Sequence, residues 1–113
     1  MLDNLTRQIV AFRDERDWKQ FHSPKNLAAS ISIEAAELLE CFQWSSDETI
    51  DDDVEKRRGE IEEEIADVLI YALLLANDTG INPTEAVRRK LAKNDAKYPA
   101  EKAKGSRAKY TEL

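Results

Sequence analysis

The chain has 113 residues, the usual size of one domain, and its formal net charge of -6 argues against general affinity for DNA or RNA polymers. Its single cysteine excludes an internal disulfide and suits a reducing compartment, so we expect a cytoplasmic location. Polar residues interrupt the N-terminal segment, so no signal peptide is expected. The longest apolar run, residues 68–76, is far shorter than the roughly 20 residues of a membrane span, so no membrane association is expected.

Apolar residues at steps of three and four predict a first helix over about residues 3–16. These apolar residues are Leu2, Leu5, Ile9 and Phe12. The segment WKQFH, at residues 18–22, interrupts this pattern. Ser23 and Pro24 then supply an N-cap and a first-turn proline, so we expect a second helix from Pro24 to about Trp44.

A polar and acidic stretch, residues 45–53, is typical of a loop in solvent. We expect a third helix from about Asp53 to Asp78, with Gly80 as its stop signal. The first half of this helix is highly charged, whereas residues 65–76 are apolar nearly all round. A helical segment that is apolar on every side must be covered on every side, so the pattern predicts a partner subunit.

Asn82 and Pro83 predict the start of a fourth helix, as a capping residue and a first-turn proline. This helix should end before Tyr98, because a residue that precedes proline leaves the helical region. Residues 99–113 are basic and polar, which predicts a tail that is loosely ordered or lies on a neighbour. Four helices and no strand pattern predict an all-α four-helix bundle in a single domain, residues 1–113.

Two pairs of carboxylates have the same spacing on neighbouring predicted helices. Glu34 and Glu37 are three residues apart, as are Glu64 and Asp67, and positions i and i+3 share a helix face. Burying unpaired carboxylates is costly, and residues 26–54 contain no lysine or arginine that could compensate their charge. Carboxylate oxygens are ligands for hard cations. The two pairs therefore predict a magnesium site that holds the phosphates of a nucleotide.

Several other polar and aromatic residues allow more than one interpretation. Glu40 continues the first pair at a step of three and is a further ligand, a group that orients a water molecule, or a solvated side chain. Lys90, Asn94 and Lys97 share one helix face, which suits phosphate binding but also an ordinary solvated face. An aromatic and imidazole set suits a stacked base but is equally typical of a bundle core: Trp18, Phe21, His22, Trp44 and Tyr71.

Five segments of the chain together match one known family. They are WKQFH (18–22), NLAASISIEAAELLECFQW (26–44), EEEIADVLIY (62–71), KNDAKYP (93–99) and KYTEL (109–113). By these segments the chain resembles the all-α MazG-like nucleoside triphosphate pyrophosphatases, most closely their dCTP pyrophosphatase branch. The family signature is E-x-x-E, a spacer and then E-x-x-D, which is met here by Glu34, Glu37, Glu64 and Asp67.

The resemblance implies roles for further residues. It implies Mg²⁺ on the four signature carboxylates and homotetramers, as dimers of dimers, whose pockets are made by more than one chain. It implies a substrate pocket lined by Trp18, Lys19, Gln20, Phe21, His22, Trp44 and Tyr71. It implies that the following lie near the phosphates: Lys90, Asn94, Lys97 and Tyr98. The dCTP branch carries a substrate-contacting histidine where this chain has Ile9, and its loop between the carboxylate pairs is longer, so base and sugar preference stays open.

The predicted function is hydrolysis of a nucleoside triphosphate, dCTP or a modified dCTP, to the monophosphate and pyrophosphate. Magnesium would lower the pKa of a water molecule that attacks the α-phosphorus, and Glu37 or Glu40 would orient that water. Trp18, Trp44 and Tyr71 would stack on or enclose the base. The alternatives are a non-catalytic helical oligomerisation module and a relative with a broad or different base preference.

Overall fold

The computed structural model describes all 113 residues, and all of its regular elements are helical. The elements are α1 (Leu2–Glu15), η1 (Lys19–Phe21), α2 (Pro24–Glu40), α3 (Ile50–Lys56), α4 (Arg58–Asp78), α5 (Pro83–Lys97), α6 (Ala100–Ala103) and η2 (Tyr110–Glu112), where η marks a 3-10 helix. The all-α prediction is therefore confirmed, with six α-helices instead of four. The chain forms two compact units, Met1–Gly80 and Ile81–Leu113, and the single domain stays a prediction.

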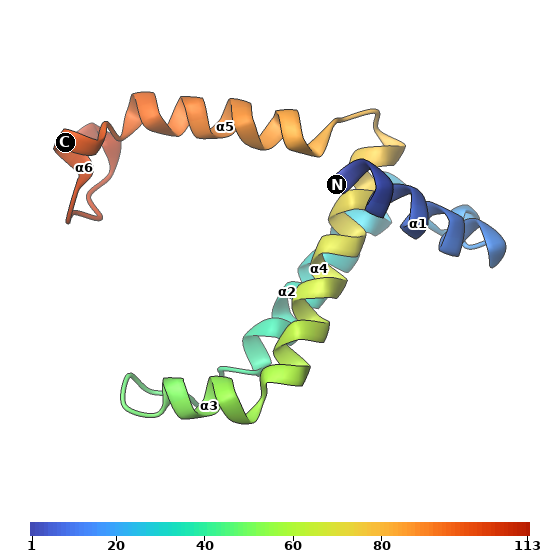
Figure 1. Cartoon of the computed structure of the whole chain (residues 1–113), viewed down its shortest axis with the longest axis horizontal. Coiled ribbons are helices and arrows are strands. Elements are labelled where there is room, and N and C mark those ends of the chain that lie inside the picture. The colour runs from blue at the N-terminus through green and yellow to red at the C-terminus, as the bar shows by residue number, and fades with distance from the viewer. The chain divides into compact units, whose positions relative to one another are not determined.

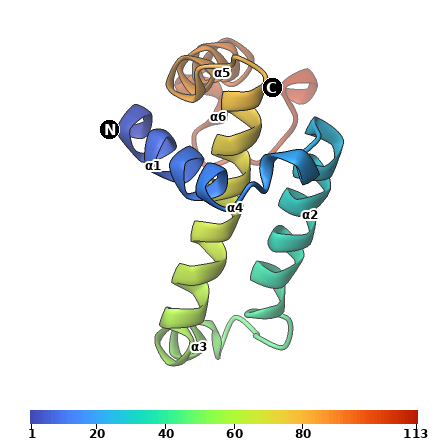
Figure 2. The same cartoon turned by 90° about the vertical axis from the view of Figure 1, so that its right-hand side faces the viewer.

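The first unit is built on a pair of long antiparallel helices. Figures 1 and 2 show α2 and α4 side by side and running in opposite directions, with α1 against α4. Helix α3 leads into the start of α4. The buried apolar side chains of the unit are Leu27, Cys41, Leu73 and Leu74, and of these only Leu27 is fully buried. The antiparallel pair brings the middle of α2 opposite the middle of α4, which is where the carboxylate pairs of the sequence lie.

Helix α2 begins where the sequence predicts. The Ser23 side chain accepts a hydrogen bond of 3.1 Å from the backbone N–H of Asn26, and Pro24 occupies the first turn. The prediction for its end was wrong, because α2 stops at Glu40 and the chain up to Trp44 forms turns.

A residue much later in the sequence forms hydrogen bonds with the end of α2. The Arg57 guanidinium donates hydrogen bonds to the backbone carbonyl oxygens of Glu40, at 3.2 Å, and Cys41, at 3.0 Å. Carbonyl groups at a helix end have no partner within the helix, and a positive charge there also suits the helix dipole. Arg57 thus caps a helix whose last residue lies 17 residues earlier in the chain.

The expected third helix is two helices. Helix α3 ends at Lys56 and α4 begins at Arg58, with Arg57 between them at φ -111° and ψ 17°. Helix α3 also occupies part of the expected loop, and the Ser45 hydroxyl donates a 2.7 Å hydrogen bond to the Asp53 carboxylate within it. Acidic residues in the first turn of α3 are favourable at a helix N-terminus. The charged run that the sequence predicts as one helix is therefore divided at Arg57, the residue that contacts the end of α2.

The second unit contains α5 and the C-terminal residues. The Asn82 side chain accepts a 3.1 Å hydrogen bond from the Glu85 backbone N–H, and α5 ends at Lys97, so both predicted ends are confirmed. The tail contains the short α6 and η2 rather than irregular chain alone. Its Tyr110 ring lies edge-on to Tyr98, with centroids 6.1 Å apart, and beneath the Lys97 ammonium at 5.0 Å.

Many large apolar side chains of the long helices are exposed. On α2 and α4 the exposed fractions are 58% for Ile33, 66% for Leu39, 45% for Ile65 and 53% for Leu69. A chain this small gains little from so limited a core. The exposure supports a partner subunit, which stays a prediction. None of the helices combines the length and the apolar character needed to cross a membrane.

Candidate functional site

Three glutamates from α2 and α4 meet at the seam between these helices. One oxygen from each of Glu34, Glu37 and Glu64 lies within 4.8 Å of the other two. The Oε2 atoms of Glu34 and Glu64 are buried and have no hydrogen-bond partner. Buried polar atoms are normally paired, so these two oxygens indicate a missing positive partner.

The electrostatics of this carboxylate cluster point the same way. Burial and the neighbouring Glu37 carboxylate raise the pKa of Glu34 to about 7. Burial and the charge of Glu37 also raise the pKa of Glu64 above its ordinary range. Nearby carboxylates that repel one another become stable ligands when a divalent cation neutralises them. The cluster therefore fits a hard divalent cation.

Asp67, the fourth predicted metal ligand, lies one turn further along α4 and is not one of the three converging residues. Its side chain lines a cavity of about 260 Å³ between α1 and α4. The negative charge of Asp67 still contributes to the raised pKa of Glu34 and of Tyr71. The structure thus brings three predicted ligands together and places the fourth in the wall of the cavity.

The cavity beside Asp67 has mainly apolar walls. Its lining residues are Ile9, Phe12, Arg13, Trp18, His22, Asp67, Ile70, Tyr71 and Leu74. The His22 ring lies edge-on to Tyr71 with centroids 6.3 Å apart, and its Nδ1 atom is buried without a partner. Burial and the Glu34 charge raise the pKa of Tyr71, so its hydroxyl stays protonated and can donate a hydrogen bond.

Only two of the five residues in the WKQFH segment line this cavity, namely Trp18 and His22. Lys19, Gln20 and Phe21 form η1 and are exposed. The Gln20 side chain instead donates to the backbone oxygen of Asp17 at 3.0 Å. The structure therefore does not bring the whole segment to the cavity.

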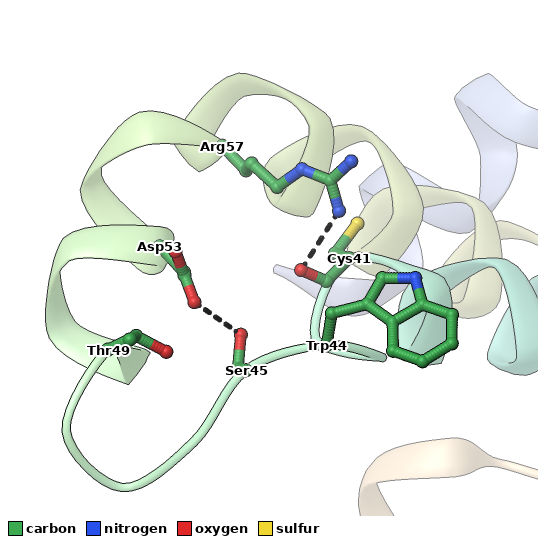
Figure 3. A pocket seen from close by; sticks show the side chains of 6 residues that line it. All are labelled: Cys41, Trp44, Ser45, Thr49, Asp53 and Arg57. Atoms are coloured by element: carbon green, nitrogen blue, oxygen red, sulfur yellow. Dashed lines mark hydrogen bonds between the residues drawn. The ribbon is translucent and has the colours of Figure 1, made fainter.

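Trp44 and Glu40 lie beyond the other end of the carboxylate cluster. Trp44 is 88% exposed and borders a separate cavity of about 270 Å³, where Arg57 reaches the Cys41 carbonyl (Figure 3). In Figure 3 its ring lies away from the Ser45–Asp53 hydrogen bond. Glu40 lines a smaller pocket of about 150 Å³ together with Glu37. Within one chain, Trp44 is therefore not beside Trp18 and Tyr71.

The remaining predicted phosphate-binding residues belong to the second unit. Lys90, Asn94 and Lys97 lie on α5, and Tyr98 follows its last residue. Lys90 and Lys97 are exposed, whereas Asn94 and Tyr98 are half-buried. Their role near the phosphates stays a prediction.

Sequence reasoning missed several residues of the cavity wall. Ile70 and Leu74 line it from α4, and Phe12 and Arg13 from α1. The α4 residues share a helix face with Asp67, at steps of three and four, so their spacing could have predicted that they line the same cavity. Which face of α1 turns towards α4 could not be read from spacing alone.

Comparisons with known proteins agree on one relationship. The MazG-like family matches residues 29–113. The dCTP pyrophosphatase 1 of Mus musculus is 40% identical over 114 residues, covering 99% of this chain and 67% of its own, and that of Homo sapiens gives the same values. A crystal structure of a pyrophosphatase from Archaeoglobus fulgidus is 56% identical with a TM-score of 0.83, covering 86% of this chain and 91% of that chain.

Proposed function

Because the chain belongs to the MazG-like family, we propose that it is a magnesium-dependent nucleotide pyrophosphohydrolase that cleaves a nucleoside triphosphate, dCTP or a modified dCTP. The products are the nucleoside monophosphate and pyrophosphate. Pyrophosphatase activity is named for the solved relative and dCTP for the mammalian relatives. The observation that carries the proposal is the cluster of Glu34, Glu37 and Glu64 beside an apolar cavity.

Four carboxylates would hold the cation, namely Glu34, Glu37, Glu64 and Asp67. When bound, Mg²⁺ would neutralise phosphate charge and lower the pKa of the attacking water molecule. Glu34, whose pKa is about 7, holds a proton for part of the time near neutral pH and would have to release it to act as a ligand. Glu37, or Glu40 in the adjoining pocket, would accept a hydrogen bond from the water that attacks the α-phosphorus.

The cavity between α1 and α4 would receive the base. Its volume of about 260 Å³ is below the roughly 300–1,000 Å³ of pockets that enclose whole ligands, so the phosphates would remain outside it, beside the carboxylates. The Tyr71 hydroxyl and the His22 ring supply polar contacts in an otherwise apolar wall. Ile9 offers no hydrogen bond, so we expect the apolar wall to accept a methyl group on the base readily.

An assembly of several chains would complete the site. Trp44 and the lysines of α5 would then contact substrate held by a neighbouring chain, as the predicted tetramer requires. The exposed Ile33, Leu39 and Leu69 side chains support such an assembly, because burying them would add apolar contact area.

The test is pyrophosphate release from a panel of nucleoside triphosphates that includes dCTP and 5-methyl-dCTP, with and without Mg²⁺. We expect release from dCTP only with the cation, and at least a hundredfold loss of kcat, about 3 kcal/mol, in Glu37→Gln and Asp67→Asn. The matched control is Glu62→Gln, because Glu62 is exposed on α4, the helix of Asp67, and is not part of the cluster.

Two results would contradict the proposal. Equal turnover by Glu37→Gln and by the Glu62→Gln control would remove the metal assignment. No release from any triphosphate, together with a melting temperature that is indifferent to Mg²⁺ and dCTP, would favour the non-catalytic oligomerisation module, because a ligand of the folded state must raise stability.

A further inference from the structure

A buried ion pair joins α1 to the last residue of α4. The Arg13 guanidinium donates two hydrogen bonds to the Asp78 carboxylate, Nη1 to Oδ2 at 2.7 Å and Nη2 to Oδ1 at 2.8 Å. The Arg13 side chain is 2% exposed and that of Asp78 is 9% exposed. Arg13 is the only buried charged residue in the chain, and its partner is 65 residues away in the sequence.

The contribution of the pair to stability does not by itself account for it. Removing two charges from water costs about as much as their attraction returns, and replacing buried ion pairs with apolar side chains is often neutral or stabilising. The Arg13 Nε atom also remains buried without a hydrogen-bond partner, which adds to the cost. A bidentate pair instead fixes the orientation of the two helices that it joins, because the planar guanidinium sets both the distance and the angle of the carboxylate.

The pair fixes the orientation of the part of α1 that lines the cavity. Arg13 lies one residue after Phe12 and one turn after Ile9, and both of these line the cavity between α1 and α4. The backbone carbonyl of Arg13 also accepts a 3.2 Å hydrogen bond from the N–H of Trp18, a further lining residue. Three lining residues therefore depend on where Arg13 is held.

Two of the lining residues, Phe12 and Trp18, also contact each other at the same end of α1. Trp18 lies edge-on to Phe12, with ring centroids 5.8 Å apart, and the Arg16 guanidinium stacks over Phe12 at 3.6 Å. These contacts lie within α1 and the turn that follows it. The Arg13–Asp78 pair is the hydrogen-bonded link between this group and α4, the helix that carries Asp67 and Tyr71.

We propose that the Arg13–Asp78 pair is a positioning device, which holds α1 in the orientation that closes the cavity over the base and so sets affinity for the base end of the nucleotide. The inference rests on the proposed function, in that the cavity receives the base. Arg13 acts here through Ile9, Phe12 and Trp18, because its Nη atoms are both committed to Asp78.

The decisive variant is the double replacement Arg13→Met with Asp78→Met, which removes both charges and keeps apolar bulk at both positions. We expect a melting temperature near that of the wild type, since buried pairs are often replaced without loss of stability. We expect KM for dCTP to rise about tenfold with a smaller change in kcat, because the base end is bound less well in the ground state and in the transition state alike.

Binding measurements without turnover separate the two ends of the nucleotide. By calorimetry with Mg²⁺, the Kd of dCMP, which carries the base, should rise about tenfold in the double variant, while the Kd of pyrophosphate stays unchanged. Arg13→Lys, which keeps the charge but loses the bidentate geometry, should give an intermediate rise. The control is Glu55→Met with Arg58→Met, an exposed ion pair between α3 and α4 that lies away from the cavity.

Each outcome decides the inference. A double variant or Arg13→Lys with wild-type KM and wild-type Kd for dCMP would overturn it, as would an equal rise in the Kd of pyrophosphate. If the double variant does not fold, the comparison of dCMP with pyrophosphate in Arg13→Lys decides. If the wild type binds dCMP but releases no pyrophosphate from dCTP, the proposed function fails, and the dCMP measurements still judge the pair.

Discussion

Replacing Glu34 with glutamine should stabilise the metal-free protein above neutral pH. Burial and Glu37 raise the pKa of Glu34 from 4.5 to about 7. The unfolded chain therefore loses this proton at lower pH than the folded chain, and stability falls as pH rises from about 4.5 to about 7. At about 1.4 kcal/mol per pH unit this interval corresponds to about 3 kcal/mol, which solvent screening of a half-buried group reduces to about 1 kcal/mol.

Glutamine cannot ionise, so Glu34→Gln should show its advantage at pH 8 and none at pH 4. The assay is urea denaturation at both pH values in EDTA, followed by circular dichroism. The control is Glu62→Gln, an exposed glutamate on α4 that is outside the carboxylate cluster. Added Mg²⁺ should reverse the order at pH 8, because the wild type then has one more charged ligand. The reasoning is wrong if Glu34→Gln is no more stable than the wild type at pH 8 in EDTA, or if its gain is equally large at pH 4.

Three further predictions concern the scaffold of the first unit. Ser23→Ala removes the acceptor at the start of α2 and should lower the free energy of unfolding by about 1 kcal/mol in urea, whereas Ser23→Asp should keep it. Leu27→Ala leaves a cavity at a side chain that is 0% exposed, so urea denaturation should give a loss of about 2–5 kcal/mol, and a loss below 1 kcal/mol would contradict the assigned core. Asp17 has φ 52°, so Asp17→Val should lower the melting temperature, while Asp17→Gly should leave it nearly unchanged because glycine adopts this conformation freely.

The starts of α2 and α5 could be read from the sequence, but the end of α2 and the break between α3 and α4 could not. Ser23 and Asn82 each cap a helix through the backbone three residues later, so the signal is local and both starts are confirmed. The end of α2 depends on Arg57, which lies outside any local window. The break before α4 depends on the same residue, and the surrounding run of charged helix-forming residues gives no sign of it.

The candidate site shows the same division between local and distant information. The spacing of Glu34 and Glu37 indicates one helix face, and the antiparallel α2–α4 pair then brings Glu64 to them. The register of that pair decides that Asp67 falls beside the cavity instead, and spacing does not contain the register. The partner of Arg13 was equally hidden, because Asp78 reads only as the polar end of a helix.

The small core of the first unit bears on how variants of this protein must be compared. Few apolar side chains are buried within one chain, while Ile33, Leu39 and Leu69 stay more than half exposed. A chain whose folding is completed by association becomes less stable on dilution, since mass action favours dissociation followed by unfolding. Its melting temperature would then depend on how much protein is in the cuvette. Two variants measured at unequal concentrations could differ in apparent stability without differing in any contact.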